Sequence, residues 1–212
     1  MYNNLPRKPG RPLSSAAVDR SAVLRNAFYL FADQGYDKAT MRALAAACGV
    51  SPALLTHMFQ TKENLWYEAV DAIYGPIHAR QVTEIRALES EPVDFQRFRD
   101  TLTRSLLDIM DVDGLLPFLV REAADDTPRG RYLRRQYLRE RLDAMWQLYQ
   151  GGCRKSNREP APRGAFDILL MGIVRVFAEP GDLQDIHAGL LDPDGRAALA
   201  KDTLERLFRA LT

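Results

Sequence analysis

Apolar residues recur at intervals of three and four positions along almost the whole chain, and this spacing decides the fold class. Such a spacing places apolar side chains on one face of an α-helix, whereas a strand needs strict alternation, which no stretch sustains. The sequence therefore predicts an all-α protein of about nine helices. The clearest stretches lie within residues 23–31, 65–73, 95–109, 138–149, 166–177 and 197–211.

Length and composition exclude several other classes. The chain has 212 residues, 46% of them hydrophobic and 27% charged, which is the range of globular proteins. Its longest apolar run, Ile168 to Val174, is far shorter than the roughly 20 residues of a membrane span. The N-terminus lacks the apolar segment of a secretory signal. We expect a cytoplasmic protein that has no membrane, cofactor or metal partner.

The net charge of +1 conceals two parts of opposite sign. Residues 1–66 carry eight Lys and Arg against four Asp and Glu, whereas the remainder carries 21 against 24. A basic first third joined to a mildly acidic remainder indicates two separate tasks.

Residues 41–60 fit a helix-turn-helix, in which two short helices cross at a tight turn. Gly49 stands where the turn needs a positive φ, and Ala45 is small where the helices cross. Ser51 can cap the second helix, with Pro52 in its first turn. An ordinary αα-hairpin is the alternative. The apolar contacts between the helices are expected from Leu44, Cys48, Val50 and Leu55.

A longer set of residues stands at the spacing of one known DNA-binding domain. On this set, roughly the first 75 residues resemble the DNA-binding domain of the TetR family of bacterial transcriptional regulators, whereas the remainder is similar only in helix number and length. The residues that carry the resemblance are Leu24, Ala27, Phe31, Gly35, Tyr36, Thr40, Leu44, Ala45, Gly49, Val50, Ser51, Leu55, Phe59, Lys62, Glu63 and Leu65.

The resemblance implies three segments and a function. They are a basic N-terminal arm over 1–17, a DNA-binding domain over 18–75 with its motif at 40–59, and an effector-binding and dimerisation domain over 76–212. The implied protein is a homodimeric transcriptional regulator that binds a palindromic operator in double-stranded DNA and is released by a small molecule. Repression is favoured, and no enzymatic activity is expected. The alternative is an architectural or redox-sensing DNA-binding protein without an effector.

The same resemblance assigns the DNA contacts residue by residue. Arg42 would contact a base, Thr40 would cap its helix and contact a phosphate, and Lys62 would hold a phosphate. Ala53, Thr56 and Met58 depart from the family pattern, in which glycine and aromatic residues are frequent there. The outward candidates on the second motif helix are Ser51, Pro52, Ala53, Thr56 and His57.

The N-terminal arm contains the sequence Arg7-Lys8-Pro9-Gly10-Arg11-Pro12. It resembles the core of an AT-hook, whose arginines enter a narrow A·T minor groove. A basic tail without groove recognition is the alternative. In both cases Arg7 and Arg11 are expected to contact DNA.

Aromatic and sulfur-containing side chains in the second half are candidates for an apolar effector site. We expect Trp146, Tyr149 and Met171 to line it, although most such residues serve only as core. The candidate polar contacts are His78, Asp108, Glu122 and Arg175, for which a surface position or a structural salt bridge is the alternative.

Two further features bear on assembly and on signalling. The segment 165–176 is apolar on almost every face, so we expect one side to be buried against the domain core and the other against a second subunit. The alternative is a central core helix in a monomer. We therefore expect dimerisation through helices near 162–178 and 193–211. Gly75-Pro76 should bend or break the helix that joins the two domains, which makes it a candidate lever.

Catalytic and redox chemistry find little support in the sequence. The three histidines are scattered, and neither a zinc motif nor a phosphate-binding loop occurs. The segments 111–114 and 192–195 resemble fragments of a calcium loop but lack its other ligands, so they are read as turns. A thiol sensor would have to use Cys48, which is expected in the motif core, or Cys153, which has Arg154 and Lys155 beside it.

Overall fold

The computed structural model describes residues 18–89, 94–178, 198–199 and 202–203. Every regular element among them is a helix, so the all-α prediction is confirmed. In chain order the elements are α1 (Arg20–Gln34), α2 (Met41–Ala47), α3 (Pro52–Phe59), α4 (Lys62–Glu89), α5 (Phe95–Met110), α6 (Leu115–Ala124), α7 (Pro128–Leu133), a π-helical turn η1 (Arg134–Leu138), α8 (Arg139–Lys155) and α9 (Arg163–Ala178).

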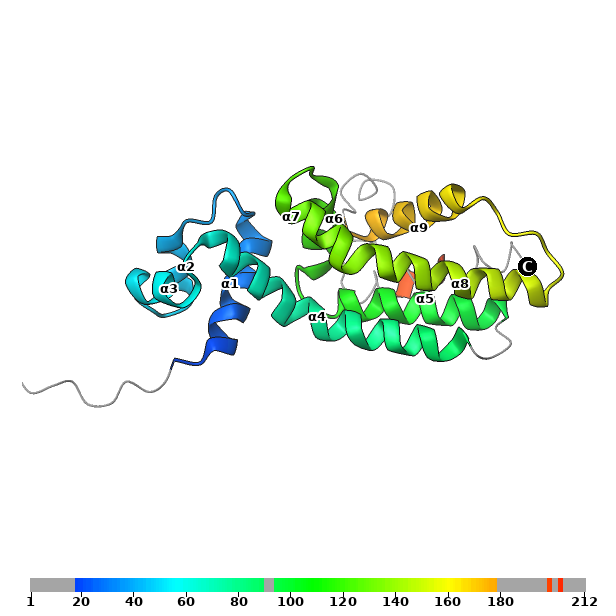
Figure 1. Cartoon of the computed structure of the whole chain (residues 1–212), viewed down its shortest axis with the longest axis horizontal. Coiled ribbons are helices and arrows are strands. Elements are labelled where there is room, and N and C mark those ends of the chain that lie inside the picture. Colours follow the sequence, from blue (N-terminus) through cyan, green and yellow to red (C-terminus); the bar gives the residue numbers. More distant parts are fainter. Residues whose placement is uncertain (1–17, 90–93, 179–197, 200–201, 204–212) are drawn as a thin grey trace, which may run out of the picture.

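The molecule is elongated, with α1, α2 and α3 at one end and α5, α8 and α9 toward the other (Figure 1). The long helix α4 joins the two ends, since it packs on α1 near its start and on α8 further along. Helices α6 and α7 lie between the ends and close over the junction. No helix of the described part of the chain is long and apolar enough to cross a membrane.

Helix α4 continues through Gly75-Pro76, so of the predicted bend or break, the break is wrong. A proline inside a helix removes one backbone hydrogen bond and disfavours the helical turn before it. Packing compensates for that loss, because Tyr74 and His78 on either side are 4% and 6% exposed. Tertiary burial therefore overrides the local preference, and a single helix crosses the boundary expected at residue 75.

An aromatic core joins the two ends of the molecule. Phe118 of α6 lies with its ring centroid 5.1 Å from that of Phe28 of α1 and 5.8 Å from that of Trp66 of α4. All three side chains are fully buried. Because large aromatic side chains each contribute about 1.5–3 kcal/mol on burial, this junction is a principal source of stability.

Helix α9 buries one face and exposes the other. Phe166, Leu170 and Phe177 are buried, whereas Ile168 is 77% exposed. Among the residues that the structure describes, the expected cover on both sides of α9 is therefore present on one side only. Of the second expected dimer segment, 193–211, all but residues 198–199 and 202–203 lies outside the described residues, as does the whole N-terminal arm with Arg7 and Arg11.

The turn between α6 and α7 depends on the absence of a side chain at Gly130. A Cβ atom there would lie 2.1 Å from the carbonyl oxygen of Asp125 and 2.7 Å from that of Glu122. Replacing Gly130 therefore has to displace backbone, whereas a Cβ at Gly164 in α9 meets nothing within 4 Å.

We expect Gly130→Ala to lower the free energy of unfolding by about 1–3 kcal/mol, as overpacking does. Gly164→Ala is the matched control and should be neutral or raise it by up to about 1 kcal/mol, because alanine is the better helix former. Urea unfolding followed by circular dichroism measures both. Equal effects of the two substitutions would contradict the close approach at Gly130.

Candidate nucleic-acid interface and ligand cavity

Helices α2 and α3 form the predicted helix-turn-helix, with each expected cap in place. The Thr40 hydroxyl accepts a hydrogen bond from the Ala43 amide, and the Ser51 hydroxyl accepts one from the Leu54 amide, both at 3.1 Å. Gly49 has a φ of 66° in the turn, a conformation that glycine adopts without strain. These local interactions fix where α3 begins and therefore which of its side chains face solvent.

The candidate DNA-contacting side chains of the motif all lie on its solvent-exposed surface. Helix α3 lies at the end of the molecule farthest from α5 and α8, with no other described helix beyond it (Figure 1). Nothing in the rest of the described chain therefore obstructs the approach of a partner to this surface. The exposed residues are Thr40, Arg42, Ser51, Pro52, Ala53, Thr56 and His57.

Lys62 differs from the expectation of a free phosphate-binding side chain. It is half-buried, and its Nζ donates a hydrogen bond to the Tyr36 carbonyl at 2.8 Å. The same ammonium lies 4.1 Å from the centroid of the Tyr36 ring, which the Arg129 guanidinium also approaches at 3.5 Å. Lys62 thus ties the loop after α1 to the start of α4, and only its remaining N–H donors are available to a phosphate.

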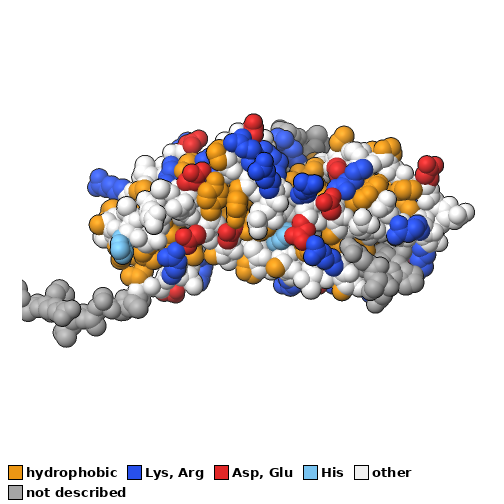
Figure 2. Space-filling view, in the orientation of Figure 1, with side chains coloured by type: hydrophobic (Ala, Val, Ile, Leu, Met, Phe, Trp, Pro, Cys, Tyr) orange, Lys and Arg blue, Asp and Glu red, His pale blue; other side chains and the backbone are white. Residues whose placement is uncertain are grey.

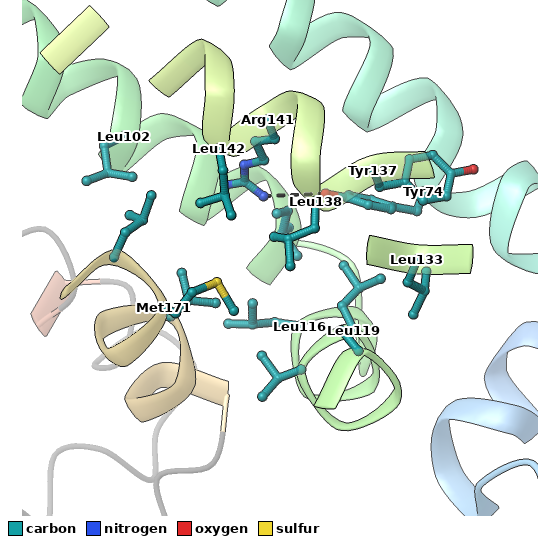
Figure 3. A pocket seen from close by; sticks show the side chains of 15 residues that line it. Tyr74, Leu102, Leu116, Leu119, Leu133, Tyr137, Leu138, Arg141, Leu142 and Met171 are labelled. Atoms are coloured by element: carbon teal, nitrogen blue, oxygen red, sulfur yellow. Dashed lines mark hydrogen bonds between the residues drawn. The ribbon is translucent and has the colours of Figure 1, made fainter. Parts of the chain in front are cut away.

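A cavity of about 70 Å³ lies between α4, α5, α6, α8 and α9. It is lined almost entirely by apolar side chains, and Figure 3 shows these converging from the surrounding helices. Its volume is well below the roughly 300–1,000 Å³ of typical ligand sites, so a ligand has to displace side chains to enter. The lining residues are Tyr74, Leu102, Ile109, Leu116, Leu119, Val120, Ala123, Leu133, Tyr137, Leu138, Arg141, Leu142, Leu170, Met171 and Val174.

The polar groups of this cavity are two tyrosines and one arginine. Arg141 Nη1 donates to the Tyr74 hydroxyl at 3.4 Å (Figure 3). The Tyr137 hydroxyl donates to the carboxylate of Asp71 on α4, which also accepts from Tyr132 at 2.6 Å. Burial, together with Asp71, raises the pKa of Tyr132 and of Tyr137, so both phenols stay protonated donors. The hydrogen bond between Tyr137 and Asp71 thus connects the cavity wall to the part of α4 that lies toward the helix-turn-helix.

A second apolar cavity, of about 160 Å³, lies beside the first, between α5, α8 and α9. The two share Leu102 and Leu170, whose side chains therefore stand between them. The second cavity is lined by Phe98, Leu102, Tyr149, Ala161, Ala165, Phe166, Leu169, Leu170 and Ile173.

Only two of the predicted ligand residues line these cavities, Met171 the first and Tyr149 the second. Trp146 instead packs against Phe166, with ring centroids 5.2 Å apart. Arg175 is on the exposed face of α9. Aromatic content alone could not separate residues that line a cavity from those that fill the core.

The other three predicted polar contacts are engaged within the protein. Asp108 pairs with Arg80 at 2.9 Å, and the buried Glu122 pairs with Arg129 at 3.4 Å. His78 Nε2 lies 3.0 Å from the Tyr137 carbonyl. Because a carbonyl only accepts, this nitrogen carries the proton. Asp108 and Glu122 thus have the structural salt bridges stated as their alternative, whereas His78 is held by a backbone carbonyl.

Arg141, Tyr74 and Tyr137 were not among the predicted ligand residues. Tyr137 and Arg141 stand four positions apart, a spacing that places them on one helical face, next to a run of leucines. That spacing is the signal that would have found them. It was hidden because residues 128–141 contain six arginines, and these suggest a solvated surface. Figure 2 shows Lys and Arg side chains gathered over the region of α7.

The two cysteines offer little to a thiol sensor. Cys153 is 1% exposed. Cys48 is half-buried, its thiol donates to the Val23 carbonyl, and burial raises its pKa, which disfavours the reactive thiolate. Within the described ranges, His, Cys, Asp and Glu side chains form no group of three that could hold a metal ion.

Comparison with known proteins identifies the first part of the chain. Residues 23–69 match the family model of the bacterial regulatory proteins of the tetR family. This N-terminal part of the chain is therefore a TetR-family DNA-binding domain. The HTH-type transcriptional regulator UidR of Escherichia coli K12 is 28% identical over 96 residues, which are 45% of this chain and 45% of UidR. The chain thus spans about half the length of the curated relatives that it matches.

Solved structures extend the likeness in fold to most of the chain. FadR of Bacillus subtilis, in complex with stearoyl-CoA, superposes with a TM-score of 0.67 at 14% identity, over 88% of this chain and 96% of FadR. A cysteine variant of the TetR family regulator CifR, with operator DNA, gives a TM-score of 0.54 at 21% identity, over 94% of this chain and 100% of CifR. At these identities the superpositions establish the shared fold.

The pH dependence of stability tests the environment of His78. Burial lowers its pKa below the usual value of 6.5, against the opposing effects of the Tyr137 carbonyl and Glu140. Below that usual value the unfolded chain takes up a proton that the folded protein excludes, so stability falls as the pH falls. Burial raises the pKa of Glu122, which acts in the opposite direction.

We expect wild-type protein to lose more stability than His78→Gln between pH 7.5 and 5.5. Glu122 is present in both proteins, so its effect cancels in the difference. Urea unfolding at fixed protein concentration gives the two profiles, whose slopes should differ by at most about 1.4 kcal/mol per pH unit. Parallel profiles would show that His78 is not the group that destabilises the fold in acid.

Proposed function

We propose that this protein is a homodimeric transcriptional regulator, favoured as a repressor, that binds palindromic operator DNA and releases it when a small molecule enters the cavity. The observation that carries the proposal is the capped helix-turn-helix with an unobstructed surface at one end of the molecule. The match of residues 23–69 to the tetR family model supports the same function. A regulator of this kind acts in the cytoplasm and needs no catalytic group.

In the proposed complex, α3 enters the major groove and the start of α2 contacts an adjacent base. Arg42 presents an exposed guanidinium that can donate two hydrogen bonds to a guanine edge. The hydroxyl of Thr56 can donate to a phosphate, although it reaches less far than an aromatic side chain. The CifR structure with operator DNA supports this use of the fold.

The exposed face of α9 supplies the proposed dimer interface. Ile168, Leu169 and Val176 are 77%, 42% and 41% exposed, and they share one helical face with Ala165 and Gly172. An apolar face of this kind is stabilised by burial against a second copy. A twofold axis along α9 would pair two helix-turn-helix units for the two halves of a palindrome.

Two contacts provide a path from the cavity to the helix-turn-helix. Tyr137 lines the cavity, and its hydroxyl donates a hydrogen bond to the carboxylate of Asp71 on α4. Arg121 of α6, the helix that forms one cavity wall, donates to the carbonyls of Phe31 and Ala32 at the end of α1, both at 3.2 Å. A ligand that displaces α6 or η1 therefore strains contacts to α1 and α4. Coupling of this kind is typically worth about 1–3 kcal/mol.

The DNA contact is tested with operator sequences selected from random double-stranded DNA by the full-length protein. Arg42→Ala should weaken binding by about 1–3 kcal/mol and relax the preference at one base pair of each half-site. Arg104→Ala is the matched control, since Arg104 is an exposed arginine of α5 on the other part of the molecule. If Arg42→Ala binds the selected sequences as wild type does, the base contact is assigned wrongly, and failure to select any sequence would refute DNA binding.

The dimer interface is tested by placing a charge on the exposed face of α9. Ile168→Glu should shift sedimentation equilibrium from dimer to monomer, because a buried unpaired carboxylate is costly. Val18→Glu alters another exposed apolar residue, 42% accessible and outside α9, and should leave the dimer intact. An Ile168→Glu protein that keeps the wild-type mass at every concentration would place the interface elsewhere.

A further inference from the structure

Arg141 is the single charged side chain among the fifteen residues that line the first cavity. It is half-buried, and Figure 3 shows its guanidinium between Leu138 and Leu142, directed toward Tyr74. Its hydrogen bond to Tyr74, at 3.4 Å, is long, and the hydroxyl that accepts it is uncharged. Among the described residues, no carboxylate forms an ion pair with Arg141 within 4.0 Å.

Each of the other half-buried arginines of the described chain has a carboxylate within 4.0 Å, which sets Arg141 apart. Arg129 pairs with Glu122, and Arg131 pairs with Asp126. Glu140, next to Arg141 in the chain, is engaged with Arg86. A guanidinium that is partly removed from water without an anionic partner loses hydration, and a ligand that supplies the anion offsets this loss.

The other residues that line the cavities indicate the chemistry of the rest of the ligand. Beyond Arg141 and the two tyrosines, every lining residue of the first cavity is apolar, and the second cavity continues behind Leu102 and Leu170. Leucine side chains can rotate to join the two spaces. An extended apolar chain would then run from Arg141 toward Phe98 and Phe166 between α5, α8 and α9.

We propose that the effector of this regulator is a carboxylate with an extended, unbranched apolar chain. Its carboxylate forms a charge-assisted hydrogen bond with Arg141, and the Tyr74 hydroxyl lies beside the same group. Its apolar chain fills the two cavities. The inference rests on the proposed function in that it names the chemistry of the molecule that occupies the cavity.

The probes are decanoate and 1-decanol, which share a chain length and differ in charge. Isothermal titration of the full-length protein, below the micellar range, should show decanoate binding at least about tenfold more tightly than 1-decanol, since hydrogen bonds to charged groups are the stronger ones. Hexanoate, octanoate and decanoate should gain up to about fourfold in affinity per CH₂ as the chain enters the cavities. Equal affinities for acid and alcohol, or no binding of either, would overturn the proposal.

Substitution of Arg141 separates its charge from its packing. Arg141→Met should remove the preference for decanoate, whereas Arg141→Lys should retain part of it. Arg139→Met, two residues earlier in α8 and exposed, is the matched control and should bind as wild type does. If Arg141→Met fails to fold, the comparison of acid with alcohol in the wild-type protein and the Arg141→Lys variant still decide the question. An unchanged preference in any folded Arg141→Met protein would assign the carboxylate to another residue.

A third arm distinguishes the thioester decanoyl-CoA from the free acid. Tight binding of decanoyl-CoA with no dependence on Arg141, and weak binding of decanoate, would overturn the free carboxylate as ligand. The selected operator DNA separates this inference from the proposed function. If decanoate binds through Arg141 but does not release the DNA, the proposed ligand class stands and ligand-induced release is refuted. If only an uncharged ligand releases the DNA, the proposed ligand class is refuted and the proposed function stands.

Discussion

The packing of Phe118 between Phe28 and Trp66 is the contact on which the rest of this structure depends. It joins α6 to both α1 and α4, so the helix-turn-helix and the helices around the cavity share one continuous core. A close-packed core of large rings cannot deform gradually, and a displacement on one side must be taken up on the other. Arg121 reinforces the junction by capping the carbonyls at the end of α1. The two parts differ in charge, yet one continuous core joins them.

The features that the sequence predicted correctly are those governed by neighbouring residues. The roles of Thr40, Ser51 and Gly49 depend only on residues a few positions away in the sequence. A helix cap and a turn with positive φ can therefore be predicted without knowing the fold. The continuity of α4 through Pro76 could not be read in this way. It is decided by the burial of Tyr74 and His78 against helices distant in sequence.

The residues that line the first cavity show a different limit of prediction from sequence. Helical periodicity identifies the inward face of each helix, but it does not say where facing side chains fail to fill the space between them. Trp146 and Leu138 both satisfy the pattern, yet the first completes an aromatic cluster and the second lines the cavity. The arginines of 128–141 illustrate the same limit for charge. Arg129 is committed to Tyr36 and Glu122, whereas Arg141 faces an apolar space, and no count of charges distinguishes them.

The π-helical turn η1, which carries Tyr137 to the cavity wall, has a consequence for how this cavity can change over evolutionary time. A π-helical turn holds one residue more than an α-helical turn and is frequently found at functional sites. Because successive residues of an α-helix differ by about 100° in direction, the loss of one residue here would turn all of α8 relative to η1 and carry Arg141 away from the cavity. Insertions and deletions at this single turn could therefore exchange the chemistry of the cavity while the aromatic junction and the helix-turn-helix stay as they are.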